Sequence, residues 1–185
     1  QALYYHLFRR KGAMAIAPNQ KYKDAYVDLS KGQISREIFV NEEIYQRELE
    51  QVFARSWLFI GHESQIEKPG DYFISGMGEE SVIMCRDRES KVHVFLNSCR
   101  HRGMKVCRYD EGNTPVSTCP YHGWSYATNG KLAGIPHLKD AYHGEIDRTQ
   151  WGLVEVAQLC IYKGCCLYTS SSPRDQRDYG LPCFV

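Results

Sequence analysis

The chain has 185 residues, enough for one hydrophobic core and little more. Lys and Arg number 23 against 22 Asp and Glu, so the net charge of +1 gives no electrostatic basis for binding nucleic acid or an anionic membrane. No apolar run approaches the roughly 20 residues of a membrane span. Residues 1–13 also lack a signal-peptide pattern, so we expect a cytoplasmic protein whose eight cysteines form no stable disulfides.

The N-terminal residues divide into an extension and a helical arm. Residues 1–33 are interpreted as the extension. Met14 opens a segment with the character of a natural start, so residues 1–13 are a candidate translated leader. Residues 34–57 are predicted to form the arm, with a helix over 41–57.

The predicted helix has a suitable beginning and one apolar face. Asn41 is suited to the N-cap, and Glu42 and Glu43 favour the first turn. The apolar face, which we expect to pack on a sheet, consists of Tyr45, Leu49, Val52 and Phe53.

From residue 58 the sequence changes to short runs rich in β-branched and aromatic residues, separated by turn residues. These runs predict strands over 58–62, 71–75, 80–86, 91–98, 124–127 and 153–162. Asn129-Gly130 is the strongest hairpin signal, and it follows one of these strands. Short strands at regular spacing predict a mainly β fold, an antiparallel sandwich or barrel.

Two matched pairs of ligand-type residues stand out within this β region. They are Cys99-x-His101 and Cys119-x-x-His122, and each is followed by a glycine, Gly103 or Gly123. Glycine lets a loop adopt positive φ and lets its backbone approach an inorganic centre closely. The pattern therefore predicts two loops that hold one metal centre between them.

Two kinds of metal fit this ligand set. Two Cys and two His can bind zinc in a tetrahedron. However, Cys-x-His is tight for two bonds to one ion, and each loop here supplies one ligand of each type. Two irons resolve this difficulty, since one can take both thiolates and the other both imidazoles. That is the ligation of a Rieske [2Fe–2S] centre, and a structural zinc module remains the alternative.

The two loops also carry a resemblance to a known family. CRHRG at 99–103 and CPYHGWSY at 119–126, together with SWLFIGHESQIEKPGDYF at 56–73, resemble the N-terminal Rieske domain of aromatic-ring-hydroxylating dioxygenase large (α) subunits. The similarity runs from Ile34 to Lys163, and the resemblance implies a Rieske β-sandwich over residues 58–163.

The resemblance implies a function for the complete protein. The family consists of bacterial enzymes that add both atoms of O₂ to an aromatic ring. Their Rieske cluster passes electrons from a ferredoxin or reductase to a mononuclear non-haem Fe(II) in a catalytic domain. We expect that domain to be absent from this chain, which would then be a fragment unable to oxygenate by itself. Other α subunits in a trimer and a β subunit are the expected partners, and a stand-alone Rieske electron carrier is the alternative.

The residues around the ligands predict a reduction potential at the low end of the Rieske range, which is roughly −150 to +300 mV. By resemblance, high-potential Rieske proteins have a disulfide between the loops and a serine after the second His-Gly. Met104, Tyr121 and Trp124 stand at these places here. Tyr126 is left as a candidate hydrogen-bond donor to sulfur, and Trp124 as a shield. The residues expected around the ligands are Arg102, Gly103, Gly123, Trp124 and Tyr126.

Other residues with metal-binding or charged side chains receive simpler interpretations. Cys107 and Cys85 are expected to be buried thiols and not ligands. The basic residues of the first loop are either an ordinary solvated surface or a dock for an acidic ferredoxin: Arg100, Arg102, Lys105 and Arg108. His137, Asp140 and His143 have the residue types of an iron-binding triad, but they are expected to lie in a surface loop.

The last residues do not follow the family pattern. After Lys163 an apolar strand is expected by resemblance, but a Cys165-Cys166 pair and a serine run follow. Residues 164–185 are therefore interpreted as an anomalous tail, for which a frameshift or truncation near 164–166 is the hypothesis and genuine divergence the alternative.

Overall fold

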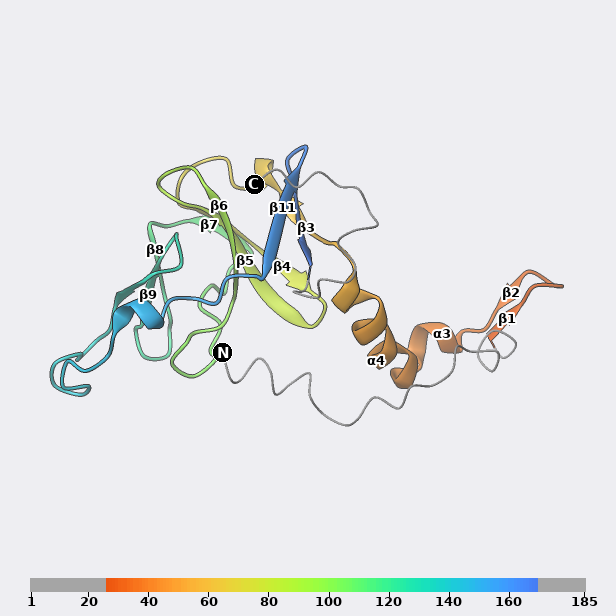
Figure 1. The fold of residues 1–185 in the computed structure, drawn as a ribbon, viewed down its shortest axis with the longest axis horizontal. Helices are drawn as coiled ribbons and strands as arrows, with labels where there is room; N and C mark the ends of the chain where they lie inside the picture. The colour runs from red at the N-terminus through yellow and green to blue at the C-terminus, as the bar shows by residue number, and fades with distance from the viewer. Residues whose placement is uncertain (1–25, 170–185) are drawn as a thin grey trace. The chain divides into compact units, whose positions relative to one another are not determined.

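The fold is mainly antiparallel β-sheet, as the sequence predicted (Figure 1). The computed structural model describes residues 26–169 and divides the chain after Arg47 into two compact units. The proposed leader and the expectations for residues 170–185 lie outside the described residues. No helix among the described residues is long and apolar enough to cross a membrane.

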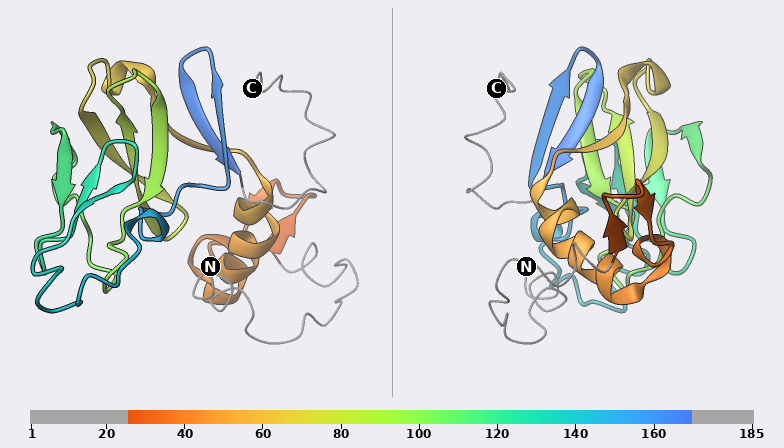
Figure 2. Two further views of the ribbon diagram at one scale, coloured as in Figure 1. Left: turned by 60° about the vertical axis from the view of Figure 1, so that its left-hand side comes forward. Right: turned by 90° about the vertical axis from the view of Figure 1, so that its right-hand side faces the viewer.

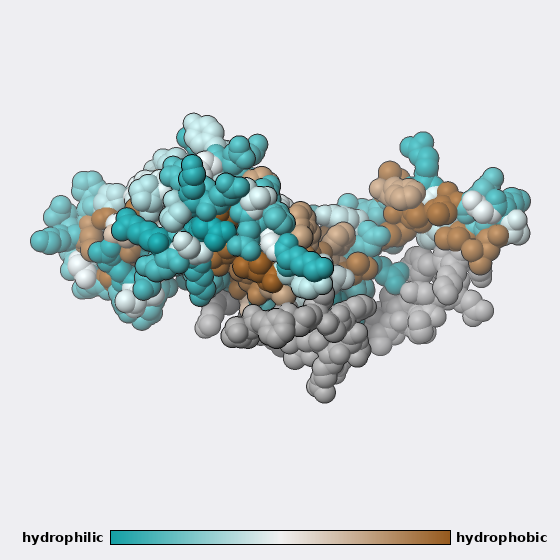
Figure 3. Space-filling view, turned by 90° about the horizontal axis from the view of Figure 1, so that it is seen from above, coloured by the Kyte–Doolittle hydropathy of each residue, from teal (hydrophilic) through white to brown (hydrophobic). Residues whose placement is uncertain are grey.

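The first unit contains a small hairpin and the beginning of the predicted helix. Strands β1 (Val27–Asp28) and β2 (Gln33–Ile34) pair antiparallel, and α3 (Glu37–Val40) follows them. The hairpin and α3 expose large apolar side chains, seen as brown surface in Figure 3: Leu29, Ile34, Phe39 and Val40.

Helix α4 (Glu42–Gln51) begins where predicted but ends earlier. The Asn41 side chain accepts hydrogen bonds from the backbone N–H groups of Glu43 and Ile44, at 3.0 and 3.3 Å, which confirms the N-cap. The predicted end at residue 57 is wrong. Val52 has φ −114°, and the chain tightens there into the 3₁₀ turn η1 (Phe53–Arg55), a common way to finish a helix. No residue of α4 is fully buried: of the predicted apolar face, Tyr45 and Val52 are exposed, and Leu49 is partly buried.

The second unit contains three antiparallel sheets. The central sheet has the order β6-β5-β4-β7, with bounds β4 Asp71–Met77, β5 Glu80–Arg86, β6 Val92–Leu96 and β7 Glu111–Asn113. A second sheet has the order β10-β9-β8, with bounds β8 Val116–Thr118, β9 Ser125–Ala127 and β10 Leu132–Gly134. The third has the order β11-β12-β3, with bounds β3 Leu58–His62, β11 Gln158–Tyr162 and β12 Cys165–Thr169.

The central sheet is covered on both faces. Alternate residues of β5 and β6, such as Val82 and Val94, pack with β3 and β12 in one core. The residues between them, such as Ile83 and Phe95, pack with Trp124 and the β8–β10 sheet in a second core. The left view of Figure 2 shows the blue β11–β12 hairpin on one side of this sheet. Burial on both faces explains why β5 and β6 read as nearly continuous apolar runs.

Strand β12 corrects the interpretation of the C-terminal segment. Its residues pair with β11 and β3, and Cys166 and Tyr168 lie in the first core. The predicted domain end at Lys163 falls in the turn between β11 and β12. Residues 165–169 are therefore part of the β fold and not of a separate tail.

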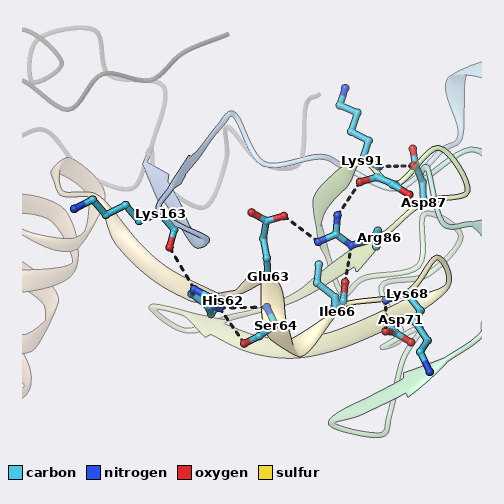
Figure 4. A network of polar contacts seen from close by, with 11 residues as sticks. His62, Glu63, Ser64, Ile66, Lys68, Asp71, Arg86, Asp87, Lys91 and Lys163 are labelled. Carbon is cyan, nitrogen blue, oxygen red and sulfur yellow. Dashed lines mark hydrogen bonds and ion pairs between the residues drawn. The ribbon is translucent and has the colours of Figure 1, made fainter.

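A partly buried arginine connects the segments around this core (Figure 4). Arg86 donates from Nε to the carbonyl of Ile66 at 2.6 Å and from a guanidinium nitrogen to the carbonyl of Ser90 at 2.8 Å. Its other terminal nitrogen pairs with Glu63 of η2 (Glu63–Gln65) at 2.9 Å. Arg86 thus ties the turn after β3 to the β5–β6 connection.

Candidate metal centre

The first ligand loop leaves β6 and folds back on itself. The N–H of Cys99 donates to the carbonyl of Met104 at 2.8 Å, and the N–H of Gly103 donates to the carbonyl of Cys99 at 2.8 Å. Gly103 has φ +73°, a conformation that costs glycine little and other residues more. The sequence-based interpretation of this glycine is consistent with its backbone.

The second ligand loop connects β8 to β9 and has the same hydrogen-bond frame. The N–H of Cys119 donates to the carbonyl of Trp124 at 2.8 Å, and the N–H of Gly123 donates to the carbonyl of Cys119 at 3.0 Å. Gly123 has φ +74°. A Cβ at this position would lie 2.8 Å from Cγ of Pro136, so the close approach also requires glycine.

The two thiols lie side by side in the second core. Cys99 is 3% exposed and Cys119 is 2% exposed. Burial raises the pKa of Cys119, and its neighbour Cys99 raises it further. A metal ligand must be a thiolate, so binding of iron at this pair would release protons.

Tyr126 lies against the sulfur of Cys99, in the place predicted for a hydrogen-bond donor. The N–H of Arg100 donates to the Tyr126 hydroxyl at 3.0 Å, and this oxygen lies 3.2 Å from Sγ of Cys99. Because the oxygen already accepts from Arg100, its own hydrogen is available for the sulfur. Burial and the neighbouring Cys99 raise the pKa of Tyr126, so the phenol keeps this proton.

The imidazoles of the two loops lie against each other. The rings of His101 and His122 have centroids 4.6 Å apart, at 73° to one another. Burial lowers the pKa of His101, and the charges of His122 and Arg102 lower it further. A neutral imidazole is the form that binds a metal.

Each imidazole has one aromatic neighbour. The indole of Trp124 stacks on His101 at 5.1 Å, with 7° between the planes, and Trp124 is only 2% exposed. The ring of Tyr121, which is 58% exposed, lies 3.8 Å from that of His122. His101 is therefore the shielded imidazole, and His122 is the one nearer to solvent.

One observation indicates that a group belongs between the loops. Nδ1 of His101 is buried and has no hydrogen-bond partner. Buried polar atoms without partners are rare in folded proteins and need an explanation. Iron at this nitrogen would supply one.

The donor set fits a binuclear centre. Among residues 26–169, no three side chains of His, Cys, Asp or Glu lie together as the ligands of a single ion. A Rieske centre takes ligands in twos, with two thiolates on one iron and two imidazoles on the other. The adjacent thiols and the facing imidazoles provide those two pairs.

The thiols of Cys107 and Cys85 have partners away from the ligand loops. Sγ of Cys107 donates to the hydroxyl of Ser117 at 3.4 Å, and Sγ of Cys85 donates to the carbonyl of Thr128 at 3.2 Å. Burial raises the pKa of Cys107, and it raises that of Cys85 to about 12.

The charged residues that the sequence singled out lie at the surface. Arg102, Lys105 and Arg108 are exposed, whereas Arg100 is partly buried and holds its guanidinium 5.8 Å from the ring centre of Trp151. His137, Asp140 and His143 are exposed in the long loop after β10.

Two residues of the site were missed by the sequence analysis. Trp151 packs edge-on against Trp124 at 5.8 Å. Asn97, at the end of β6, is a buried polar residue whose side chain bonds to the far end of the first loop. A polar residue that ends an apolar strand just before a ligand loop was the available signal for Asn97.

Comparisons with known proteins show the family to which this chain belongs. Residues 56–171 match the family model of the Rieske [2Fe-2S] domain. The chain is similar to the benzene 1,2-dioxygenase α subunit of Pseudomonas putida, at 47% identity over 137 residues, covering 74% of this chain and 30% of that protein. It is similar to the biphenyl dioxygenase α subunit of Paraburkholderia xenovorans at 44% identity over 144 residues, covering 75% and 31%.

A solved structure also resembles this chain. Naphthalene 1,2-dioxygenase from a Rhodococcus species superposes with a TM-score of 0.69 at 40% identity, covering 73% of this chain and 32% of that one. The chain thus spans about 30% of the length of the curated relatives it matches.

Proposed function

We propose, from the premise that this chain belongs to the Rieske [2Fe–2S] family, that it transfers electrons through a cluster held by four side chains: Cys99, His101, Cys119 and His122. The observation that carries this ligand assignment is the unpartnered, buried Nδ1 of His101, which lies beside a second imidazole, in two loops that also carry two buried thiols. When bound, the cluster supplies one-electron redox chemistry.

The surrounding residues have definable tasks in this proposal. Two ferric ions, two sulfides and two thiolates sum to zero charge, so the reduced centre gains one negative charge that the protein must stabilise. The O–H of Tyr126 is aimed at the sulfur of Cys99, where it favours that charge. Trp124 keeps water from the face of His101.

We further propose that the complete protein is the large subunit of a dioxygenase that adds O₂ to aromatic compounds. The support is the similarity to the α subunits of benzene and biphenyl dioxygenases. An aromatic substrate, a mononuclear iron, further subunits and a ferredoxin or reductase donor belong to this wider proposal. The exposed Arg102, Lys105 and Arg108 would attract an acidic donor, with a rate that falls as salt rises.

The ligand assignment is tested by substitution with a matched control. Cys99→Ala and Cys119→Ala should each abolish the visible absorption and the Rieske EPR signal of the reduced protein. Cys107→Ala removes another buried thiol from the same core and should keep both signals. Wild-type protein should contain iron and acid-labile sulfide in equal amounts.

Two results would contradict the proposal. Zinc without sulfide would identify a structural zinc module. Loss of the cluster in a folded Cys107→Ala protein, with retention in Cys99→Ala, would overturn the assignment of ligands.

A further inference from the structure

We propose that Asn97 is the positioning residue of the centre. Its side chain closes the neck of the first ligand loop, which is the place where Asn97 faces the returning residues 106–107. It thereby sets the positions of Cys99 and His101. This inference rests on the proposed function, because it concerns how the same site is held. It assigns a role to a residue that binds no metal.

Asn97 is buried, and its amide is engaged on both sides. It is 3% exposed. Its Oδ1 accepts from the backbone N–H of Val106 at 2.9 Å and of Cys107 at 3.0 Å. Its Nδ2 donates to the carbonyl of Cys107 at 2.8 Å and to the hydroxyl of Ser81 at 3.3 Å.

These side-chain hydrogen bonds take the place of strand pairing for the returning end of the loop. The backbone of Asn97 still belongs to the central sheet, since its N–H donates to the carbonyl of Ser81 at 2.8 Å. The returning segment at Val106 and Cys107 is buried but pairs with no strand in the part of the chain described. The side-chain amide gives this segment the acceptors and the donor that a neighbouring backbone would give.

The second ligand loop shows why the first one needs such a residue. Its two ends are the paired strands β8 and β9, with Thr118 opposite Ser125, so a backbone ladder closes its neck. Across the neck of the first loop, the hydrogen bonds of the described residues all come from the Asn97 side chain. The neck of one loop is closed by secondary structure, and the neck of the other is closed by one side-chain amide.

The position in the chain links this neck to the ligands. Asn97 precedes Cys99 by two residues, and Cys99 starts the inner frame that ends at Met104. Between the neck and this frame lie only Ser98 and Lys105. A displaced neck would therefore move Cys99 and His101 relative to Cys119 and His122, which stay on the β8–β9 hairpin.

The first test uses the apoprotein and needs no cluster. In Asn97→Ala, hydrogen exchange at the amides of residues 99–107 should accelerate by about ten-fold or more, because two buried N–H groups lose their acceptor. The amides of Cys119 and of residues 121–124 should keep their wild-type rates. Equal acceleration in both loops, or none in the first, would overturn the proposal.

The second test uses the loaded protein and separates positioning from general stability. Val94→Ala is the matched control, because Val94 lies in the other core, on the opposite face of the central sheet. Asn97→Ala should shift the reduction potential and the EPR g-values and should lose iron to a chelator about ten-fold faster, as expected for lost buried hydrogen bonds. Val94→Ala should lower the melting temperature with a wild-type spectrum.

A conservative variant completes the design. Asn97→Asp keeps the one oxygen that accepts from Val106 and Cys107 and replaces the donor with a second oxygen that faces the Cys107 carbonyl, so its exchange rates should lie between those of the wild type and Asn97→Ala. It carries the test if Asn97→Ala does not fold. Two results would show that Asn97 is an ordinary core residue. One is a folded Asn97→Asp protein with wild-type exchange rates and spectrum. The other is a spectral shift in Val94→Ala as large as that in Asn97→Ala. A wild-type protein that holds no cluster would refute the proposed function, while the apoprotein test of Asn97 would still stand.

Discussion

Replacement of Arg86 by alanine tests the polar network of Figure 4 as a determinant of stability. The Arg86 side chain is 13% exposed. Its guanidinium donates to the carbonyls of Ile66 and Ser90 and pairs with Glu63. Hydrogen bonds from a charged group contribute about 1.5–3 kcal/mol each when buried. The Glu63 carboxylate is 35% exposed, so its ion pair adds about 1 kcal/mol at most.

The expected loss is therefore about 3 kcal/mol, most of it from the carbonyl of fully buried Ile66. At about 2–4 °C per kcal/mol for a chain of this size, the melting temperature should fall by about 10 °C. Urea titration followed by circular dichroism measures the change, with Arg88→Ala as the control. Arg88 is exposed in the same connection and carries the same charge. Equal destabilisation by both variants would show that the net charge matters and the network does not.

Two further predictions concern the second loop and the β5–β6 turn. In urea titration, Gly123→Ala should lower the free energy of unfolding by at least about 1–2 kcal/mol, because alanine would have to adopt positive φ and would contact Pro136. Gly76→Ala is the control and should change little, since the space around Gly76 is open. For Asp87, burial raises the pKa, but the hydrogen bond from His93 and those from backbone N–H groups outweigh burial and hold the pKa below its ordinary value. The stability that Asp87 contributes is complete above the ordinary carboxyl pKa of about 3.9 and is lost as the pH falls through the lower folded-state pKa. Asp87→Asn should therefore flatten the loss of stability below about pH 4, and an unchanged slope in urea titrations across that range would contradict this assignment.

The strands that the sequence predicted are those whose own side chains specify them. β3 and β5 have the predicted bounds, because both are rich in apolar and β-branched residues and end at turn residues. β7, with the sequence EGN, is exposed at every position and carries no apolar pattern. It exists because its backbone pairs with Asp71 to Phe73 of β4, a partner about forty residues away. Propensity at the segment itself could not reveal this pairing.

The candidate site divides in the same way between local and distant information. The four proposed ligands and their glycines were found because each pair lies within five residues of sequence. Trp151 was missed because its contact with Trp124 joins two distant segments of the chain. Asn97 was missed although Val106 is only nine residues away, because the sequence does not show that its side chain turns back to the returning end of the loop. The predicted donor Tyr126 does lie beside Cys99, although the pair is separated by 27 residues.

The shared frame of the two loops explains why the two motifs have different spacing. In each loop the cysteine carbonyl accepts from the glycine four residues later, so Cys99 corresponds to Cys119 and Gly103 to Gly123. When these positions are aligned, His101 is equivalent to Tyr121, and His122 is equivalent to Arg102. The imidazoles therefore come from successive positions of one backbone shape. In the second loop the position equivalent to His101 is therefore Tyr121, which directly precedes His122. The ring centroids of Tyr121 and His122 are 3.8 Å apart. The spacings Cys-x-His and Cys-x-x-His are thus a consequence of two equivalent loops that present their histidines from different places.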